Sequence, residues 1–147
     1  EQLRQAVLDD VGGLLALLKP LEASGMLVAR TRERLEHEIE DYVVIDRDGM
    51  AIGCAALHGY ADARMGELAC LAVHDDYRRG ARGEMLLAEI ERRARRQGLT
   101  QLFALTTHTT HWFVERGFSL PTPEALPALK RETYNQARRS KVLLKSL

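Results

Sequence analysis

The sequence of 147 residues contains few cysteines and aromatic residues, and neither sign of charge is in excess. Its two cysteines, Cys54 and Cys70, lie in apolar segments, which argues against a disulfide framework and predicts reduced, buried thiols. Lys+Arg and Asp+Glu each number 21, a balance that indicates neither a nucleic-acid nor a membrane-surface ligand. No apolar run approaches the ~18 residues that cross a membrane, and no signal peptide opens the chain. We therefore expect a cytoplasmic protein without nucleic-acid or membrane partners.

Length and periodicity predict one α+β domain spanning residues 1–147. Asp48-Gly49 is a strong hairpin signal, Thr31 is a plausible helix N-cap, and Gly98 is a plausible helix stop. Because the chain begins at Glu1 and not at methionine, we expect it to be part of a longer protein. The predicted strands are 3–7, 42–45, 51–60, 67–74, 102–106 and 141–144. The predicted helices are 9–21, 31–39, 83–97, a short one containing Trp112 and Phe113, and a segment before the last strand.

The most informative segment runs from Glu67 to Leu87, where a buried strand leads through a basic loop into a helix predicted to begin at Gly83. A helix N-terminus presents unpaired backbone N–H groups and the positive end of the helix dipole. Arg78, Arg79 and Arg82 add guanidinium groups, which pair well with phosphates. This combination predicts a site for a pyrophosphate-bearing cofactor.

This order of elements, with its loop Arg78-Arg79-Gly80-Ala81-Arg82-Gly83, resembles the GNAT acetyltransferases, whose loop pattern is Gln/Arg-x-x-Gly-x-Gly/Ala. Ala81 replaces the middle glycine. Over nearly the whole chain the sequence is similar to the acetyltransferase domains of bacterial N-acetylglutamate synthases, which tolerate this replacement. The matching segments are Pro20-Leu21-Glu22, Gly25-Met26-Leu27-Val28, Gly66-Glu67-Leu68-Ala69-Cys70, Val73-His74, Asp76-Tyr77-Arg78, Arg82-Gly83-Glu84, Leu105-Thr106-Thr107, His111-Trp112-Phe113, Glu115-Arg116-Gly117-Phe118, Tyr134-Asn135 and Arg139-Ser140-Lys141-Val142-Leu143.

The resemblance implies a GNAT fold with a mixed, mostly antiparallel sheet, helices on both faces, and acetyl-CoA as co-substrate. A bulge in the strand before the loop would present backbone N–H groups to the pantetheine and the thioester carbonyl. The residues expected to bind the cofactor are Leu71, Ala72, Val73, Arg78, Arg79, Gly80, Ala81, Arg82, Gly83 and Glu84. The alternatives are an ordinary buried strand and solvated surface arginines.

Glu67 is the expected general base, a carboxylate in a strand of Leu, Ala, Cys and Val. By simple alternation it shares a face with Ala69, Leu71 and Val73, so a bulge or the strand end must aim it at a substrate. The alternative is a strand-edge salt bridge. Cys70 could form an acyl-cysteine or touch the substrate, although a cysteine among apolar residues is more often packing.

The resemblance also implies a small dicarboxylic amino acid, L-glutamate, as acceptor. Carboxylates are bound best by arginine forks and hydroxyl donors, and the motif positions carry over Arg30, Arg138, Arg139 and Ser140. A solvated surface position is the alternative for each arginine. Many relatives protonate the departing thiolate with a tyrosine where this chain has Phe113, so the general acid stays open, with Tyr134 as a fallback.

Two other patterns carry less weight. His108 and His111 lack a nearby third metal ligand, so no metal is expected. The run 92–96 is rich in arginine, but Glu89 and Glu91 are placed to pair with Arg93 and Arg95, which predicts a solvated helix face.

The predicted function is acetyl transfer from acetyl-CoA to the α-amine of L-glutamate by direct attack in a ternary complex. One alternative is an acetyltransferase for another amine or for a protein. Another is a non-catalytic CoA-binding regulatory module. The resembling family usually carries an N-terminal amino-acid-kinase-like domain, which would lie outside this chain. The sequence leaves open whether the chain forms a homo-oligomer.

Overall fold

A single six-stranded sheet organises the molecule. The computed structural model describes residues 1–25, 27, 29–106, 110–120 and 141–147. The strands lie in the order of the chain, and all neighbours are antiparallel except β4 and β5, which are parallel. The strands are β1 (Gln2–Gln5), β2 (Tyr42–Arg47), β3 (Met50–Tyr60), β4 (Met65–Val73), β5 (Gln101–Thr106) and β6 (Lys141–Ser146). The predicted α+β class with a mostly antiparallel sheet is confirmed.

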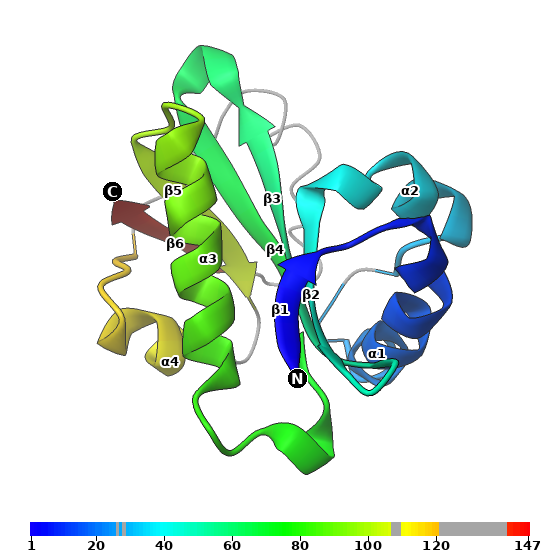
Figure 1. Ribbon diagram of the computed structural model, residues 1–147. Coiled ribbons are helices and arrows are strands. Elements are labelled where there is room, and N and C mark those ends of the chain that lie inside the picture. Colours follow the sequence, from blue (N-terminus) through cyan, green and yellow to red (C-terminus); the bar gives the residue numbers. More distant parts are fainter. Residues whose placement is uncertain (26, 28, 107–109, 121–140) are drawn as a thin grey trace.

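Helices cover both faces of the sheet (Figure 1). On one face, α1 (Val11–Ala23) packs against β3 and β4, with α2 (Arg32–His37) beside it. On the opposite face, α3 (Arg82–Arg96) packs against the same two strands, and α4 (Thr110–Glu115) lies against β6. The central strands β3 and β4 are therefore covered on both sides.

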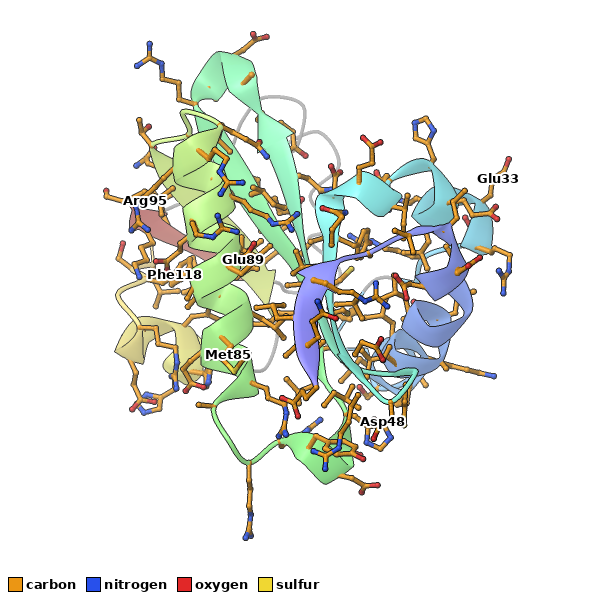
Figure 2. The ribbon with its side chains drawn as sticks, in the orientation of Figure 1. Glu33, Asp48, Met85, Glu89, Arg95 and Phe118 are labelled. Carbon is orange, nitrogen blue, oxygen red and sulfur yellow. The ribbon has the colours of Figure 1, made fainter. Side chains whose placement is uncertain are left out.

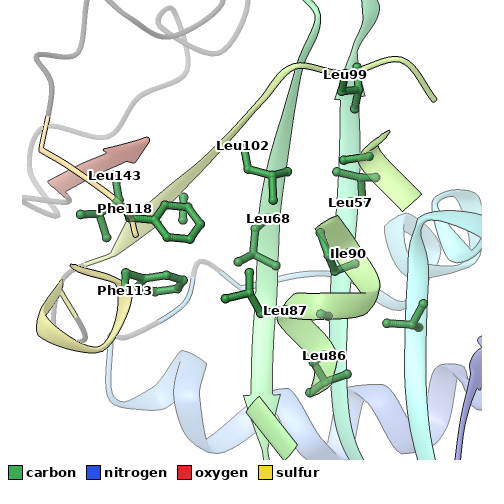
Figure 3. Packing of buried hydrophobic residues seen from close by; sticks show 14 of the residues in the cluster. Leu57, Leu68, Leu86, Leu87, Ile90, Leu99, Leu102, Phe113, Phe118 and Leu143 are labelled. Carbon is green, nitrogen blue, oxygen red and sulfur yellow. The ribbon is translucent and has the colours of Figure 1, made fainter. Parts of the chain in front are cut away.

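The hydrophobic core is divided by the sheet into two layers. Under α3, the side chains of Leu86, Leu87 and Ile90 pack on Leu57 and Leu68 (Figure 3). The layer continues under α4 through three further buried residues, Phe113, Phe118 and Leu143. The layer under α1 contains Leu14, Leu18, Leu35, Tyr42, Val44, Cys54 and Cys70. Both cysteines are free and buried, as predicted.

Several local signals act as predicted. The Thr31 hydroxyl accepts a hydrogen bond from Arg34 N at 3.0 Å and caps α2. Asp48 and Gly49, with φ of 52° and 87°, join β2 to β3 through a turn with two left-handed residues.

Element ends differ from the sequence prediction by a few residues. Residues 8–10 form a 3₁₀ turn, so α1 begins at Val11 with Asp10, not the predicted Asp9, in the N-cap position, and Pro20 lies inside the helix. Helix α3 begins at Arg82, one residue before the predicted start. Ends shift in this way because the last turns of helices are weakly determined by local sequence. The predicted helical segment before the last strand lies outside the described residues.

The outer face of α3 carries a ladder of ion pairs, and Figure 2 shows Glu89 and Arg95 pointing outward from it. Glu89 pairs with Arg93 at 2.8 Å, and Glu91 pairs with Arg95 at 3.6 Å, as the spacing predicts. Glu91 also pairs with Lys145 of β6 at 2.8 Å. The arginine-rich run is thus a solvated, ion-paired helix face.

Candidate active site

A β-bulge at Cys70 shapes the centre of the site. Ala56 of β3 is paired with Ala69, whereas Cys54 is paired with Ala72, so Cys70 and Leu71 together oppose one residue of β3. Cys70 takes the left-handed conformation, with φ of 52°. The Cys54 thiol donates to the Cys70 carbonyl at 3.2 Å, which fixes the bulged backbone.

The bulge changes which side chains of β4 share a face. Ala69 and Cys70, although consecutive, both belong to the core layer under α1, and Ala72 joins them. Leu71 and Val73 pack instead against the layer under α3. The prediction that simple alternation would keep Leu71 and Val73 beside Glu67 is therefore wrong, because the extra residue reverses the alternation. The predicted bulge itself is confirmed.

Glu67 lies on the face covered by α1 and α2. It is 5% exposed, the one buried residue with a charged side chain in the part of the chain that the structure describes. Its register partners are His58 on β3 and Phe103 on β5. The pKa of Tyr60 is raised, mainly because the phenol is buried and secondly because the Glu67 carboxylate is near. A buried carboxylate between two paired strands is costly to keep, so its position suggests a function beyond packing.

Arg30 brings a positive charge to the same face. Its backbone N–H donates to the Glu22 carboxylate at 3.1 Å, and its half-buried guanidinium interacts electrostatically with Cys70, Tyr42 and Glu67. Burial alone lowers the pKa of Arg30, but these neighbours raise it overall, so the guanidinium stays charged. The structure thus brings together three sequence-predicted residues, Arg30, Glu67 and Cys70.

The Cys70 thiol is held in its neutral form. Burial raises the pKa of Cys70, and the opposing effects of Arg30 and of a hydrogen bond with Tyr42 are smaller. The Tyr42 hydroxyl lies 3.5 Å from Cys70 Sγ, and burial likewise raises the pKa of Tyr42. A neutral buried thiol is a poor nucleophile, so Cys70 is better placed to contact a ligand than to be acylated.

The ladder between β4 and β5 ends next to Glu67. These strands pair only over Met65–Glu67 with Gln101–Phe103. Beyond Glu67, the side of β4 that faces away from β3 has no strand partner within the described residues. Leu71, Ala72 and Val73 lie on this part of β4, where backbone polar groups need a partner other than a described strand.

The basic loop between β4 and α3 has a left-handed turn at its end. Gly80 and Ala81 have φ of 107° and 60°, and α3 begins directly after them. Two positive φ values before a helix aim successive backbone N–H groups at one point, a geometry that suits anions. Ala81 takes this left-handed conformation at the position where the family pattern has glycine.

The three loop arginines lie in different environments. Arg82 ties the loop together, because its Nη1 donates to the carbonyls of Tyr77 and Arg79 at 2.9 and 2.7 Å while Nε and Nη2 pair with Glu1. Arg78 pairs with Asp75 at 2.8 Å. The exposed Arg79 side chain makes no hydrogen bond or ion pair with the described part of the chain. Arg82 therefore shapes the loop, whereas Arg79 is the most available to an anion.

Helix α4 is fastened to the start of α3. The Arg116 guanidinium pairs with Glu84, lowers the pKa of that carboxylate, and stacks over the Trp112 ring at 4.0 Å. A Cβ on Gly83 would lie 3.1 Å from Trp112 Cζ2, so only glycine leaves the indole its full space there. The first turn of α3, which includes the predicted residues Gly83 and Glu84, is thus fixed by α4.

Comparison with known protein families identifies this arrangement. Residues 15–118 match the model of the acetyltransferase (GNAT) family. The chain belongs to the GNAT acetyltransferases. An amino-acid acetyltransferase of Ectopseudomonas mendocina is 56% identical over all 147 residues, and one of Vibrio cholerae is 51% identical. The chain spans 34% and 33% of the lengths of these relatives.

A crystal structure shows the same GNAT fold at close similarity. N-acetylglutamate synthase from Neisseria gonorrhoeae, complexed with coenzyme A and N-acetyl-glutamate, has a TM-score of 0.95 and 43% identity. The alignment covers 99% of this chain and 35% of that one. The family resemblance and the GNAT fold inferred from sequence are confirmed.

Arg138, Arg139, Ser140 and the fallback acid Tyr134 lie outside the described residues. Phe113, which the family resemblance matches to the tyrosine of many relatives, is buried, and its ring centroid lies 5.2 Å from that of Phe118. The phenyl side chain of Phe113 has no proton to donate. The general acid therefore stays unassigned.

Sequence reasoning missed two residues next to Glu67 and Cys70, Tyr42 and His58, and also Asp41, which contacts His58. Tyr42 reaches Cys70, and His58 is the register partner of Glu67. The alternation of β3 could have placed His58 on a defined face. The pairing of His58 with Glu67 depends on where the β3–β4 hairpin turns, because the register runs unbroken from that turn to Ala56 and Ala69.

Within the described residues, no three His, Cys, Asp or Glu side chains gather as they would around a metal ion. His111 is exposed and pairs with Glu115 at 3.4 Å, while His108 lies outside those residues. No described helix combines the length and apolar character of a membrane span.

Proposed function

We propose that this GNAT domain transfers the acetyl group of acetyl-CoA to the α-amine of L-glutamate, giving N-acetyl-L-glutamate and CoA. The observation that carries the proposal is the grouping of Arg30, Glu67 and Cys70 on one face of β4. This group lies where the ladder with β5 ends. The Neisseria relative, crystallised with coenzyme A and N-acetyl-glutamate, supports both ligands.

The residues present fit acetyl-CoA as a substrate. The segment Leu71–Val73 lies beyond the ladder with β5, and its backbone N–H groups on that side are proposed to bind the pantetheine arm and the thioester carbonyl. The loop Arg78–Ala81 and the first turn of α3, with Arg82, Gly83 and Glu84, offer backbone N–H groups to the pyrophosphate. In this arrangement Arg79 supplies positive charge, and Arg82 holds the loop in shape.

Glu67 is proposed as the general base. The α-amine of glutamate is protonated near neutral pH and becomes nucleophilic only after losing a proton, which the carboxylate takes directly or through one water. The neutral amine then attacks the thioester carbonyl, the C–S bond breaks, and CoA leaves as the thiolate, which is protonated afterwards. The direct route agrees with the neutral Cys70 thiol, since an acyl-cysteine would need a thiolate.

Arg30 is proposed to bind a carboxylate of glutamate. Its charged guanidinium, half buried beside Glu67, can pair with a second anion and hold the amine toward the base. Arg138, Arg139 and Ser140 are proposed, from their motif positions alone, to bind the other carboxylate. Such an arginine-lined site would repel a cationic lysine acceptor.

The test is CoA release by this chain with acetyl-CoA and glutamate, aspartate, glutamine, ornithine or lysine as acceptor. We expect release with glutamate and little with the cationic amino acids. Release with ornithine or lysine in preference to glutamate would assign a different amine substrate. CoA binding without release for any acceptor would contradict the proposed activity and indicate a binding module.

A further inference from the structure

We propose that His58, held by Asp41, is a positioning residue that carries the proton taken up by Glu67 out to solvent. This inference rests on the proposed function, because it concerns the proton that the general base removes from the amine. A buried base needs such an exit, since each turnover leaves it protonated.

The register places His58 directly opposite Glu67. The two residues are Cα partners in the antiparallel pair of β3 and β4, so both side chains point to the face covered by α1 and α2. Directly opposed side chains in such a pair have Cβ atoms about 4.5–5.5 Å apart. The Tyr42 ring, 6.2 Å from the imidazole by ring centroids, packs edge-on against His58 and limits its movement.

One nitrogen of His58 is engaged and the other is not. Nδ1 lies 2.9 Å from the Asp41 carboxylate, and because an ionised carboxylate only accepts, Nδ1 carries the proton of the neutral ring. Nε2 is buried and has no hydrogen-bond partner among the residues that the structure describes. A buried, unpartnered nitrogen lone pair is costly in a packed interior, and such groups often have a chemical role.

The arrangement gives a balanced proton route. Protonated Glu67 passes its proton to Nε2, directly or through one water, and the ring becomes an imidazolium that the Asp41 carboxylate stabilises. The imidazolium then loses its Nδ1 proton through Asp41 to water. Water molecules then take the proton from Nε2 and return one to Nδ1, which restores the starting tautomer with a net release of one proton. The exposures agree with this direction, because the His58 side chain is 11% exposed and that of Asp41 is 42% exposed.

The variant His58→Asn tests the route. The asparagine amide can still donate to Asp41 as Nδ1 does, but it has no group in place of Nε2 and cannot carry a proton. We expect kcat with glutamate to fall about tenfold, less than the ~10²–10⁴-fold of a primary acid–base group, with both KM values near wild type. Added imidazole should restore much of the lost kcat. His37→Asn, an exposed histidine on α2, serves as the matched control.

The outcomes are separable from those of the proposed function. Wild-type kcat in His58→Asn, or a loss that imidazole does not restore and that raises KM for glutamate, would reduce His58 to a structural role. If His58→Asn does not fold, Asp41→Asn decides, and an unchanged kcat there overturns the route. A wild-type chain that acetylates no amino acid would instead refute the proposed function itself.

Discussion

The conformation of Cys70 shows how much a single residue decides in this molecule. With φ of 52°, it adds a residue to β4 opposite β3 and turns both Ala69 and Cys70 toward α1. Non-glycine residues seldom take this conformation, and where they do a functional constraint is common. Here the bulge separates the face that holds Glu67 and Arg30 from the backbone that we propose binds acetyl-CoA.

Replacing Glu67 by glutamine tests its proposed role as the general base. The amide keeps the size of the side chain but cannot accept the amine proton, so we expect turnover with glutamate to fall by ~10²–10⁴-fold. CoA binding, measured by calorimetry, should be retained. Glu33→Gln, whose carboxylate lies on the outside of α2 in Figure 2, should behave as wild type. Unchanged turnover in Glu67→Gln would remove Glu67 from the mechanism.

Asp10 makes stability depend on pH. Hydrogen bonds from Arg4 at 2.8 and 3.0 Å lower the pKa of Asp10, and the Val7 N–H donates to the same carboxylate at 2.7 Å. A carboxylate whose folded pKa is depressed adds stability above its unfolded pKa, near 3.9, and loses it as pH falls through the folded value.

Asp10→Asn should therefore lower the free energy of unfolding by about 1–2 kcal/mol at pH 7. The difference in free energy of unfolding between Asp10→Asn and the wild type should become smaller below about pH 4. Urea titrations at pH 7, 5 and 3 measure this difference. Asp9→Asn, at an exposed position, serves as the control. A gap that stays constant across this range would exclude ionisation of Asp10 as its origin.

At the scale of elements, the β4–α3 connection is built to hold its backbone rigidly. Arg82 bridges the carbonyls of Tyr77 and Arg79, and its ring-facing guanidinium lies 5.4 Å from the centre of Tyr77. Rigid backbone N–H groups bind an anion with little loss of conformational entropy. The unusual feature is Ala81, which takes a left-handed conformation without being glycine.

Ala81→Gly should stabilise the protein modestly. A left-handed L-residue costs roughly 1–2 kcal/mol, and the extra unfolded-state entropy of glycine offsets roughly 0.5–1 kcal/mol of that gain. We expect a net gain of about 0.5 kcal/mol in urea unfolding. Ala88→Gly, at an exposed position of α3, should instead lower the free energy of unfolding by about 1 kcal/mol. Equal losses from both variants would show that Ala81 is not strained.

The whole molecule depends on close packing on both sides of β4. Gly66 lies where the parallel ladder with β5 begins, next to Leu57 and Leu99 under the end of α3. A Cβ added there would lie 2.6 Å from Leu57 Cδ1 and 2.9 Å from Leu99 Cδ1. Because Glu67 follows directly, an error of packing at Gly66 would move the proposed base.

Gly66→Ala should lower the free energy of unfolding by about 1–3 kcal/mol, since extra volume in a filled core forces its neighbours apart. It should also reduce kcat without removing any functional group. Gly12→Ala is the matched control, because its Cβ would meet only Arg32 Nη2 at 3.8 Å, and helix propensity predicts a gain of about 0.5 kcal/mol. Thermal and urea unfolding measure the stability of both variants relative to the wild type. A Gly66→Ala variant as stable as the wild type would contradict the prediction that a Cβ overpacks this position.

Local sequence determined those features whose physics is local. The Asp48-Gly49 turn, the Thr31 cap, the Gly98 stop of α3 and the ion pairs along it follow from residues a few positions apart. The GNAT family could be inferred too, because its loop and flanking motifs are short and contiguous. Glu67 and Arg30 could be named from motif positions, without any knowledge of how they meet.

The tertiary structure alone decided how the site is assembled. The bulge at Cys70 shifts the register of β4 against β3 after Ala69, so that Cys54 pairs with Ala72. His58 and Glu67 pair on the turn side of that bulge. The meeting of Arg30 with Cys70 joins the α1–α2 connection to the middle of the sheet, and the place where β4 leaves β5 is set by packing. Such contacts link residues far apart in sequence, so no local propensity encodes them.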